Sequence, residues 1–200
     1  MPNSNKIKYG VSDVHIAKAN ISATGRVTYD TPVAFPGAVS ISLDPEGDTS
    51  PFYADNIVYF RSTANNGYTG SLEVAYIPDW FRLAYLGDVK DSHGVIVEQS
   101  NTASPAYFAM LFQFQGDVKA VRHVLYYCTA SRPSTEASTK EDSISPQTET
   151  LNLTSDPRPL DGLVKARTGE DTASETYNAW YTSVYVPTVD SNGDIQVTSG

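Results

Sequence analysis

The stretch that most restricts the fold is residues 107–131, which read YFAMLFQFQGDVKAVRHVLYYCTAS. Two strongly apolar runs flank a short polar segment around Gln115, Gly116 and Asp117. Turn-forming residues between two runs rich in valine, leucine and aromatic side chains predict a β-hairpin. Because the runs are long and almost continuously apolar, we expect both strands to lie at the centre of a sheet. Other strands must then cover this pair.

The composition agrees with one mainly β domain that has its own core. The chain has 200 residues, of which 40% are hydrophobic and 18% charged, so there is enough apolar material for a core and too little charge for a disordered chain. Thirteen tyrosines against two methionines also favour strands. We therefore expect a mainly β fold, with a β-sandwich or barrel as its architecture.

Two more strand patterns precede the central hairpin. Residues 38–43 have apolar side chains at every second position, which predicts one buried and one wet face. The apolar positions of that strand are Val39, Ile41 and Leu43. Residues 57–63 and 70–77 predict a second hairpin, closed over Asn66-Gly67, because tight hairpin turns need residues that accept a positive φ.

Two short helices and two strands complete the expected layout. Pro78 suits the first position of a helix and Gly87 the residue after its end. The apolar face of that helix is expected to comprise Trp80, Leu83 and Ala84, with Leu86 beside it. Thr172 and Glu175 have the spacing of a capping box and predict a second short helix. Strands are also expected at residues 147–153 and over the VYVP near the end of the chain.

The formal net charge of −9 restricts the function. Binding to nucleic-acid phosphates or to an anionic membrane surface needs clustered lysine and arginine, so we expect neither. An acidic wall would instead repel a passing phosphate backbone. The N-terminus has no apolar run of the kind found in signal peptides, and no stretch approaches the roughly 20 apolar residues of a membrane span. One cysteine, Cys128, excludes an intrachain disulfide.

An acidic segment, DPEGDTSPFYADN, occupies residues 44–56 and contains no lysine or arginine. It carries the acids Asp44, Glu46, Asp48 and Asp55 and the aromatic pair Phe52 and Tyr53. The segment has three possible interpretations: a metal-binding loop, a disordered linker, or an arm that binds another molecule. Pro45 and Gly47 between the acids favour a turn over a calcium loop. Asp190, Asn192 and Asp194 also alternate as in a calcium loop, but the glycine and the later bidentate glutamate are missing.

No residue set predicts catalysis, a metal or a cofactor. Cys128 and His123 are five positions apart in an expected strand, so their side chains should point to opposite faces. On this reading Cys128 shares a buried face with Val124, Tyr126 and Ala130. His15 and His93 stand alone among polar residues, where solvated side chains are expected. We therefore expect a protein that is not an enzyme.

The chain resembles the major tail proteins, or tail tube proteins, of long-tailed, non-contractile bacteriophages of Gram-positive bacteria. The resemblance covers about 180 residues in order. It includes YGVSDVHIA, PGAVSISLDPEGDTSPFYADNIVYF, ANNGYTGSLEVAYIPDWF and LGDVKDSHGVIVE. It continues through FAMLFQFQGDVKAVRHVLYYCTASRPS, TKEDSISPQTETLNLT, DGLVKARTGEDT and YNAWYTSVYVP.

The resemblance implies a structural role in the virion, with assembly in the host cytoplasm. Proteins of this family fold as a tail-tube-type β-sandwich or barrel with a short flanking α-helix and extended arms and loops. They form hexameric rings that stack into a tube. The implied partners are other copies of the chain, the tape-measure protein in the lumen, and the tail terminator and distal tail proteins. DNA passes through the tube without specific binding. Residues 1–188 would form the tube domain, with an N-terminal arm over about 1–12 and the long loop 44–56. Residues 189–200 would form a tail too short for the immunoglobulin-like domain that some relatives append.

The acidic segment is the expected contact between subunits, with Asp44, Glu46, Asp48 and Asp55 around the apolar anchors Phe52 and Tyr53. Arms that order only on assembly should be rich in turn formers, which fits residues 44–56 and 131–146. Glu73 and Glu149 are expected on wet strand faces that line the lumen. The alternative function is a β-sandwich module that binds carbohydrate or calcium, based on the aromatic content and the acidic segments.

Overall fold

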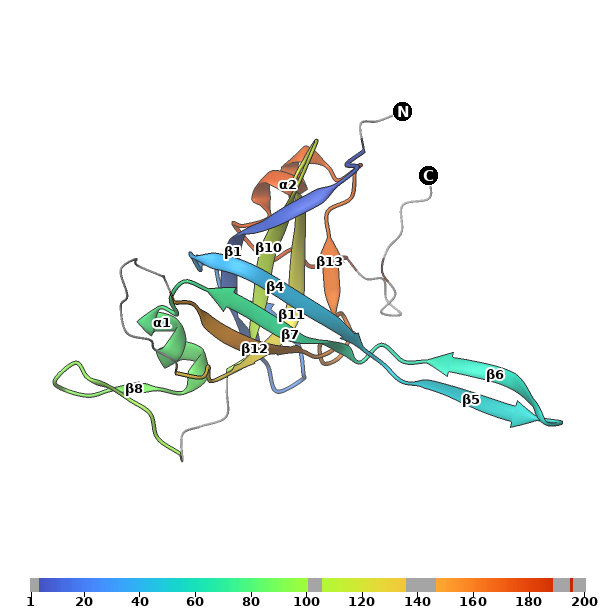
Figure 1. Ribbon diagram of the computed structural model, residues 1–200, viewed down its shortest axis with the longest axis horizontal. Coiled ribbons are helices and arrows are strands. Elements are labelled where there is room, and N and C mark those ends of the chain that lie inside the picture. The colour runs from blue at the N-terminus through green and yellow to red at the C-terminus, as the bar shows by residue number, and fades with distance from the viewer. Residues whose placement is uncertain (1–3, 101–105, 136–146, 189–194, 196–200) are drawn as a thin grey trace, which may run out of the picture.

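The computed structural model describes residues 4–100, 106–135, 147–188 and 195. These residues form a mainly β fold, as the sequence predicts (Figure 1). One sheet dominates, and its seven-strand path runs β2-β1-β10-β11-β12-β7-β4. The bounds are β1 Lys8–Ile21, β2 Val27–Tyr29, β4 Ala38–Glu46, β7 Gly67–Val74, β10 Phe108–Gly116, β11 Val121–Ser131 and β12 Glu149–Ser155. Two short strands join its sides: β3 (Val33–Ala34) pairs with β1, and β13 (Lys165–Arg167) pairs with β11.

The predicted central hairpin is confirmed as β10–β11. All side chains from Phe108 to Phe112 and from His123 to Cys128 are buried. The register changes from Phe108↔Cys128 to Met110↔Leu125, so β11 carries one residue more than β10 across this interval. This β-bulge increases the local twist and changes which β11 side chains share a face.

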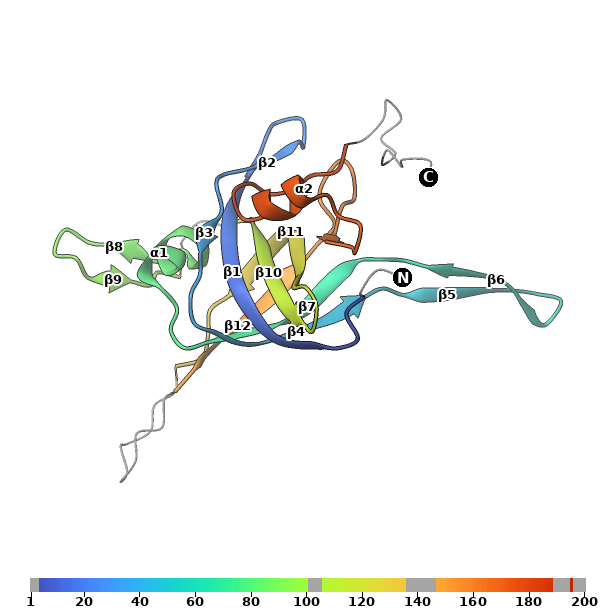
Figure 2. The same cartoon turned by 90° about the horizontal axis from the view of Figure 1, so that it is seen from above.

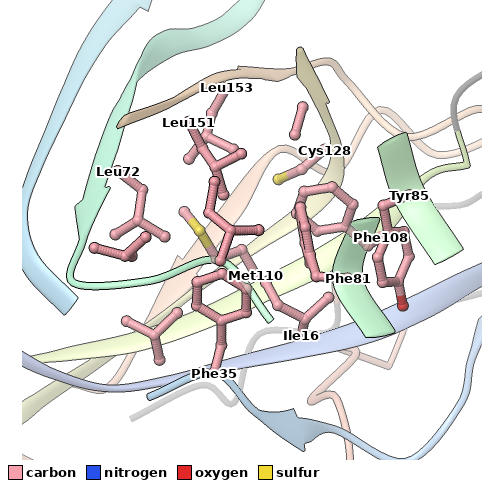
Figure 3. Close-up of a cluster of buried hydrophobic side chains, with 14 of the residues drawn as sticks. Ile16, Phe35, Leu72, Phe81, Tyr85, Phe108, Met110, Cys128, Leu151 and Leu153 are labelled. Carbon is pink, nitrogen blue, oxygen red and sulfur yellow. The ribbon is translucent and has the colours of Figure 1, made fainter. Parts of the chain in front are cut away.

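The long sheet folds over itself into two layers (Figures 1 and 2). One layer is β1-β10-β11 and the other is β12-β7-β4, with the main core between them. Figure 3 shows side chains from both layers meeting there. The contributors include Ile16, Leu72, Phe108, Met110, Cys128, Leu151 and Leu153. The β-sandwich-like arrangement therefore comes from one continuous, strongly bent antiparallel sheet.

The first helix closes one end of this core, and its buried face agrees only in part with the prediction. It comprises α1 (Asp79–Phe81) and a π-helical turn, η1 (Arg82–Leu86), and Gly87 ends it in the left-handed conformation (φ 78°). Leu86 is buried and Trp80 packs against the core, as predicted. Ala84 is exposed, and the other buried side chains are Phe81 and Tyr85. The wider turn of the π-helix explains the error, because the prediction assumed α-helical spacing.

The second helix, α2 (Ser174–Ala179), covers the other face of β1-β10-β11 (Figure 2). Trp180, directly after the helix, is buried there and donates through Nε1 to the carbonyl oxygen of His123 at 3.3 Å. The predicted capping box does not form, because Ala173 is the N-cap and Thr172 Oγ1 accepts from the Gly169 N–H instead. The predicted strand at VYVP is also wrong, since residues 184–188 have no regular structure.

The predicted hairpin between residues 57–63 and 70–77 is wrong. Strand β6 (Ile57–Thr63) pairs with β5 (Thr49–Ala54), while β7 pairs with β4 and β12. The turn that closes β5–β6 is Asp55-Asn56, and both residues have positive φ (52° and 62°). Asn and Asp tolerate this conformation, so this pair forms the tight turn that the sequence pattern predicts at Asn66-Gly67.

Two other strand predictions hold with shifted details. Strand β4 extends to Glu46, and an irregularity between Ala38 and Ser40 leaves Val39 52% exposed, outside the expected apolar face. Strand β12 begins two residues later than predicted.

The N-terminal arm over residues 1–12 is a strand from Lys8 onward, paired with β10. Strands β8 (Val89–Lys90) and β9 (Ile96–Val97) form a small separate hairpin.

Candidate assembly surfaces

The acidic segment 44–56 is not a loop, which corrects the prediction. It comprises the end of β4, the strand β5 and the turn Asp55-Asn56. The β5–β6 hairpin continues the β4–β7 pair through two hydrogen bonds: the N–H of Asn66 donates to the Glu46 carbonyl oxygen (2.8 Å) and that of Ala64 to the Asp48 carbonyl oxygen (3.0 Å). We call residues 49–63 the ribbon. Figures 1 and 2 show it projecting from the body of the fold.

The predicted contact residues are therefore spread along one extended strand pair rather than gathered in a loop. At a rise of about 3.3 Å per residue, Asp44 and Asp55 are separated by up to about 36 Å. Asp44 and Glu46 belong to β4, and Asp48 lies at the root of the ribbon. Phe52 and Tyr53 belong to β5, where Phe52 stands opposite Phe60 in the register. Asp55 lies at the tip. All four acids are exposed.

The ribbon exposes large apolar side chains along its length. Their exposed fractions are 63% for Tyr53, 63% for Ile57, 41% for Val58, 74% for Tyr59 and 62% for Phe60. Sequence reasoning missed the last four, because it gave β6 to another hairpin. The sequence signal that was available is the Asp55-Asn56 pair, which can form a tight turn directly before β6. The apolar and polar residues of β6 also alternate less clearly than those of the other strands.

A second surface is the free edge of the sheet. Strand β4 ends the seven-strand path, and within the described residues β7 is its only partner. Its outer edge therefore presents backbone N–H and C=O groups that another strand can pair with.

A third surface, which we call the polar face, is the side of β4, β7 and β12 turned away from the core. Cross-strand pairs such as Ser42↔Ser71 and Ser71↔Asn152 form rows across it. Its charged members are Asp44, Glu46 and Glu73, without a lysine or arginine among the strand residues that contribute. The Glu73 carboxylate accepts from Thr148 Oγ1 (2.6 Å) and Ser40 Oγ (2.8 Å), and these hydrogen bonds, Thr148 first, lower the pKa of Glu73.

Glu149 does not lie on this polar face, which corrects that part of the lumen prediction. It stands opposite Val74, which is fully buried, and so points to the core side of β12. There its carboxylate forms an ion pair with Arg82 and accepts from the backbone N–H of Ile77 at 2.6 Å. Glu149 thus joins β12 to the first helix.

Cys128 and His123 do not form a catalytic pair. However, the prediction that their side chains point to opposite faces of the strand is wrong. The bulge in β11 places both on the side of the main core, because His123 stacks on Phe112 and Cys128 packs with Leu125. Cys128 is fully buried, and its burial raises the pKa of the thiol to about 12. Such a thiol is a small apolar group at neutral pH.

The other polar candidates carry no visible chemistry. Within the described ranges, no group of three or more His, Cys, Asp or Glu side chains is placed to hold a metal ion. His15 stacks on Tyr181, and His93 contacts Asp91 at the β8–β9 turn. The calcium-like pattern Asp190, Asn192, Asp194 lies outside the described residues. None of the helices in the described part has the length and apolarity that crossing a membrane requires.

Comparisons with known proteins add one structural likeness. No family model matches the chain, and no curated protein matches it in sequence. Among solved structures, the chain is similar to the tube-terminating cap of the anti-feeding prophage. The TM-score is 0.44 with 11% sequence identity, over 83% of this chain and 95% of the cap chain.

Proposed function

We propose that the chain is the major subunit of a phage tail tube, which polymerises as stacked, hexameric rings around the tape-measure protein. The observation that carries the proposal is the ribbon, a two-stranded hairpin that exposes five large apolar side chains and lies outside the core. An isolated two-stranded hairpin is marginally stable in water, and exposed apolar surface of this kind marks an interaction site. Burying each of these side chains would contribute about 1.5–3 kcal/mol. The ordered resemblance to tail tube proteins supplies the partner, another copy of the chain.

The free edge of β4 supports ring formation. Closed rings use a heterologous contact, in which one surface of a subunit meets a different surface of the next. A strand edge paired with a neighbour removes the aggregation hazard of an open edge. The ring number of six rests on the family resemblance.

The polar face supports a conducting lumen. It holds uncharged hydroxyl and amide groups and three acids, and its strand residues include no lysine or arginine that would bind a phosphate backbone. DNA would pass such a wall without being held. In this arrangement α2, on the opposite layer, faces outward. The tail terminator and distal tail proteins would meet the two ends of the tube, and the assembled protein would reside in the virion.

Electron microscopy of the purified protein at high concentration tests the proposal. Wild-type chain should form tubes or rings, whereas Tyr59→Ser/Phe60→Ser should stay monomeric with an unchanged circular dichroism spectrum. Val118→Ser is the matched control, because Val118 is 51% exposed on another turn. Absence of rings and tubes from the wild type at all concentrations, and absence of the chain from tails, would remove the proposal.

The alternative of a carbohydrate-binding or calcium-binding module has one feature in its favour, the exposed rings of Tyr53 and Tyr59. Aromatic side chains of this kind can stack on sugars. Calorimetry with a glycan panel and with calcium separates the two functions, since a tube subunit should release no heat with either.

A further inference from the structure

Three cations at one end of the fold have no acidic partner among the residues that the structure describes. Lys165 and Arg167 of β13 flank the start of β11, where they pair in register with Leu125 and His123. Lys8, at the start of β1, lies over the ring of Phe114 at 5.1 Å. Within the described residues, no ion pair neutralises any of these three side chains. In a chain of net charge −9, such a local positive surplus is unusual.

Two of these cations, Lys165 and Arg167, line a concave surface, which we call the basic hollow. It has a volume of about 400 Å³ and is lined by Asn65, Tyr68 and residues 162–167. The Lys165 ammonium lies 4.9 Å from the centre of the Tyr68 ring. Burial first, and then the charges of Lys8 and Arg167, lower the pKa of Lys165. An incoming carboxylate would relieve this unfavourable environment.

The hollow also offers a free strand edge. Within the described chain β13 pairs with β11 alone, and its residues line the hollow. A turn or strand of another molecule can therefore meet both cations and backbone hydrogen-bonding groups there.

We propose that the basic hollow receives the tip of the ribbon of a second copy, with Asp55 of that copy between Lys165 and Arg167. This inference rests on the proposed function. The tip carries the matching charge, because Asp55 is exposed and Tyr53 and Ile57, each 63% exposed, flank it. The carboxylate of Asp55 can pair with the two cations of the hollow, and the apolar side chains beside it can pack against Tyr68.

The placement of tip and hollow makes the contact intermolecular. Asn65, which lines the hollow, lies at the root of the ribbon, whereas Asp55 lies at its far end. The six residues of β5 separate the two by about 20 Å at 3.3 Å per residue. A copy cannot fill its own hollow, and each contact adds the next copy head to tail. This arrangement suits contacts between stacked rings.

Charge reversal in assembly assays tests the contact. Asp55→Lys alone and Arg167→Glu alone should each reduce tube formation at least tenfold, and an equimolar mixture of the two variants should recover part of it. Because Arg167 is exposed, its replacement should leave the thermal unfolding of the monomer unchanged. Lys8→Glu, also at an exposed position, gives a second variant if Arg167→Glu does not fold.

A disulfide cross-link checks the geometry. Asp55→Cys/Arg167→Cys should give ladders of covalently joined chains on non-reducing gels, whereas Asp48→Cys/Arg167→Cys should not. Wild-type tubes with undiminished assembly of both charge-reversal variants would overturn this contact while leaving the proposed function intact. Ladders from the Asp48 pair alone would overturn it equally. Failure of the wild type to assemble at all would instead remove the proposed function.

Discussion

Gly47 at the root of the ribbon lies against the backbone of Ala64. A Cβ atom at position 47 would stand 2.0 Å from the Ala64 carbonyl oxygen, well inside van der Waals contact. The adjacent hydrogen bond from the Ala64 N–H to Asp48 holds the two strands together there. The direction in which the ribbon leaves the body therefore depends on a glycine at this position.

Replacing Gly47 should separate ribbon placement from folding. Gly47→Ala must push the two strands apart at the root and change the angle of the ribbon. We expect tube formation to fall sharply while the melting temperature of the monomer changes by only a few degrees, because the main core is elsewhere. Gly169→Ala is the control, since a Cβ there meets only Thr172 Oγ1 at 4.0 Å. Equal assembly of both variants would contradict this role.

Glu149 and Glu73 should differ in their contribution to stability. Glu149→Ala leaves the Arg82 guanidinium and the buried backbone N–H of Ile77 without their carboxylate partner. We expect a loss of about 1–3 kcal/mol in the free energy of unfolding, the usual cost of an unsatisfied buried donor. Glu73→Ala should change it much less, because water can replace the carboxylate on the polar face. Urea unfolding of both variants measures the difference, and equal losses would contradict the assignment of the two faces.

The strongest local patterns of the sequence were sufficient for the core of the fold. Long apolar runs around Gly116 identified β10–β11, and alternation identified β4. Gly87 marked the end of the first helix. These features depend on residues close together in the chain, so pattern and propensity report them directly.

The remaining features depend on pairings that a single sequence does not specify. Asn66-Gly67 is a stronger turn pair than Asp55-Asn56, yet Gly67 begins β7, and a Cβ there would stand 1.9 Å from the carbonyl oxygen of Ser155. The bulge at Tyr126 and Tyr127 reverses the face of every later residue in β11. The basic hollow could not be found either, because Tyr68 and Lys165, which line it, are distant in sequence.

His123 should make the fold less stable in acid. Burial first, and then the charges of Lys165, Arg167 and Lys8, lower the pKa of His123 from 6.5 to about 4. The unfolded chain therefore binds more protons than the folded chain between these two pH values. Stability from this residue is complete above pH 6.5 and is lost as the pH falls toward 4, by up to about 3 kcal/mol.

His123→Phe isolates this effect, because a phenyl ring can keep the stack on Phe112 without binding a proton. Urea unfolding at pH 7.5 and pH 4.5 should show a smaller loss for the variant than for the wild type. His93→Phe is the control, since His93 is exposed beside Asp91. Identical losses for wild type and His123→Phe would refute the contribution.

The charge of the polar face should determine whether the tube binds DNA during its passage. Ser42 and Asn152 lie in one row across β4, β7 and β12, and both are exposed. Ser42→Lys/Asn152→Lys adds two positive charges to the proposed lumen, so the tubes should form and should retain DNA in a salt-dependent way. Glu175→Lys on α2 changes the net charge by the same amount on the opposite layer and should leave passage unaffected. Virions carrying the first variant should deliver DNA less efficiently than virions carrying the second. Equal delivery by both would place the polar face outside the lumen.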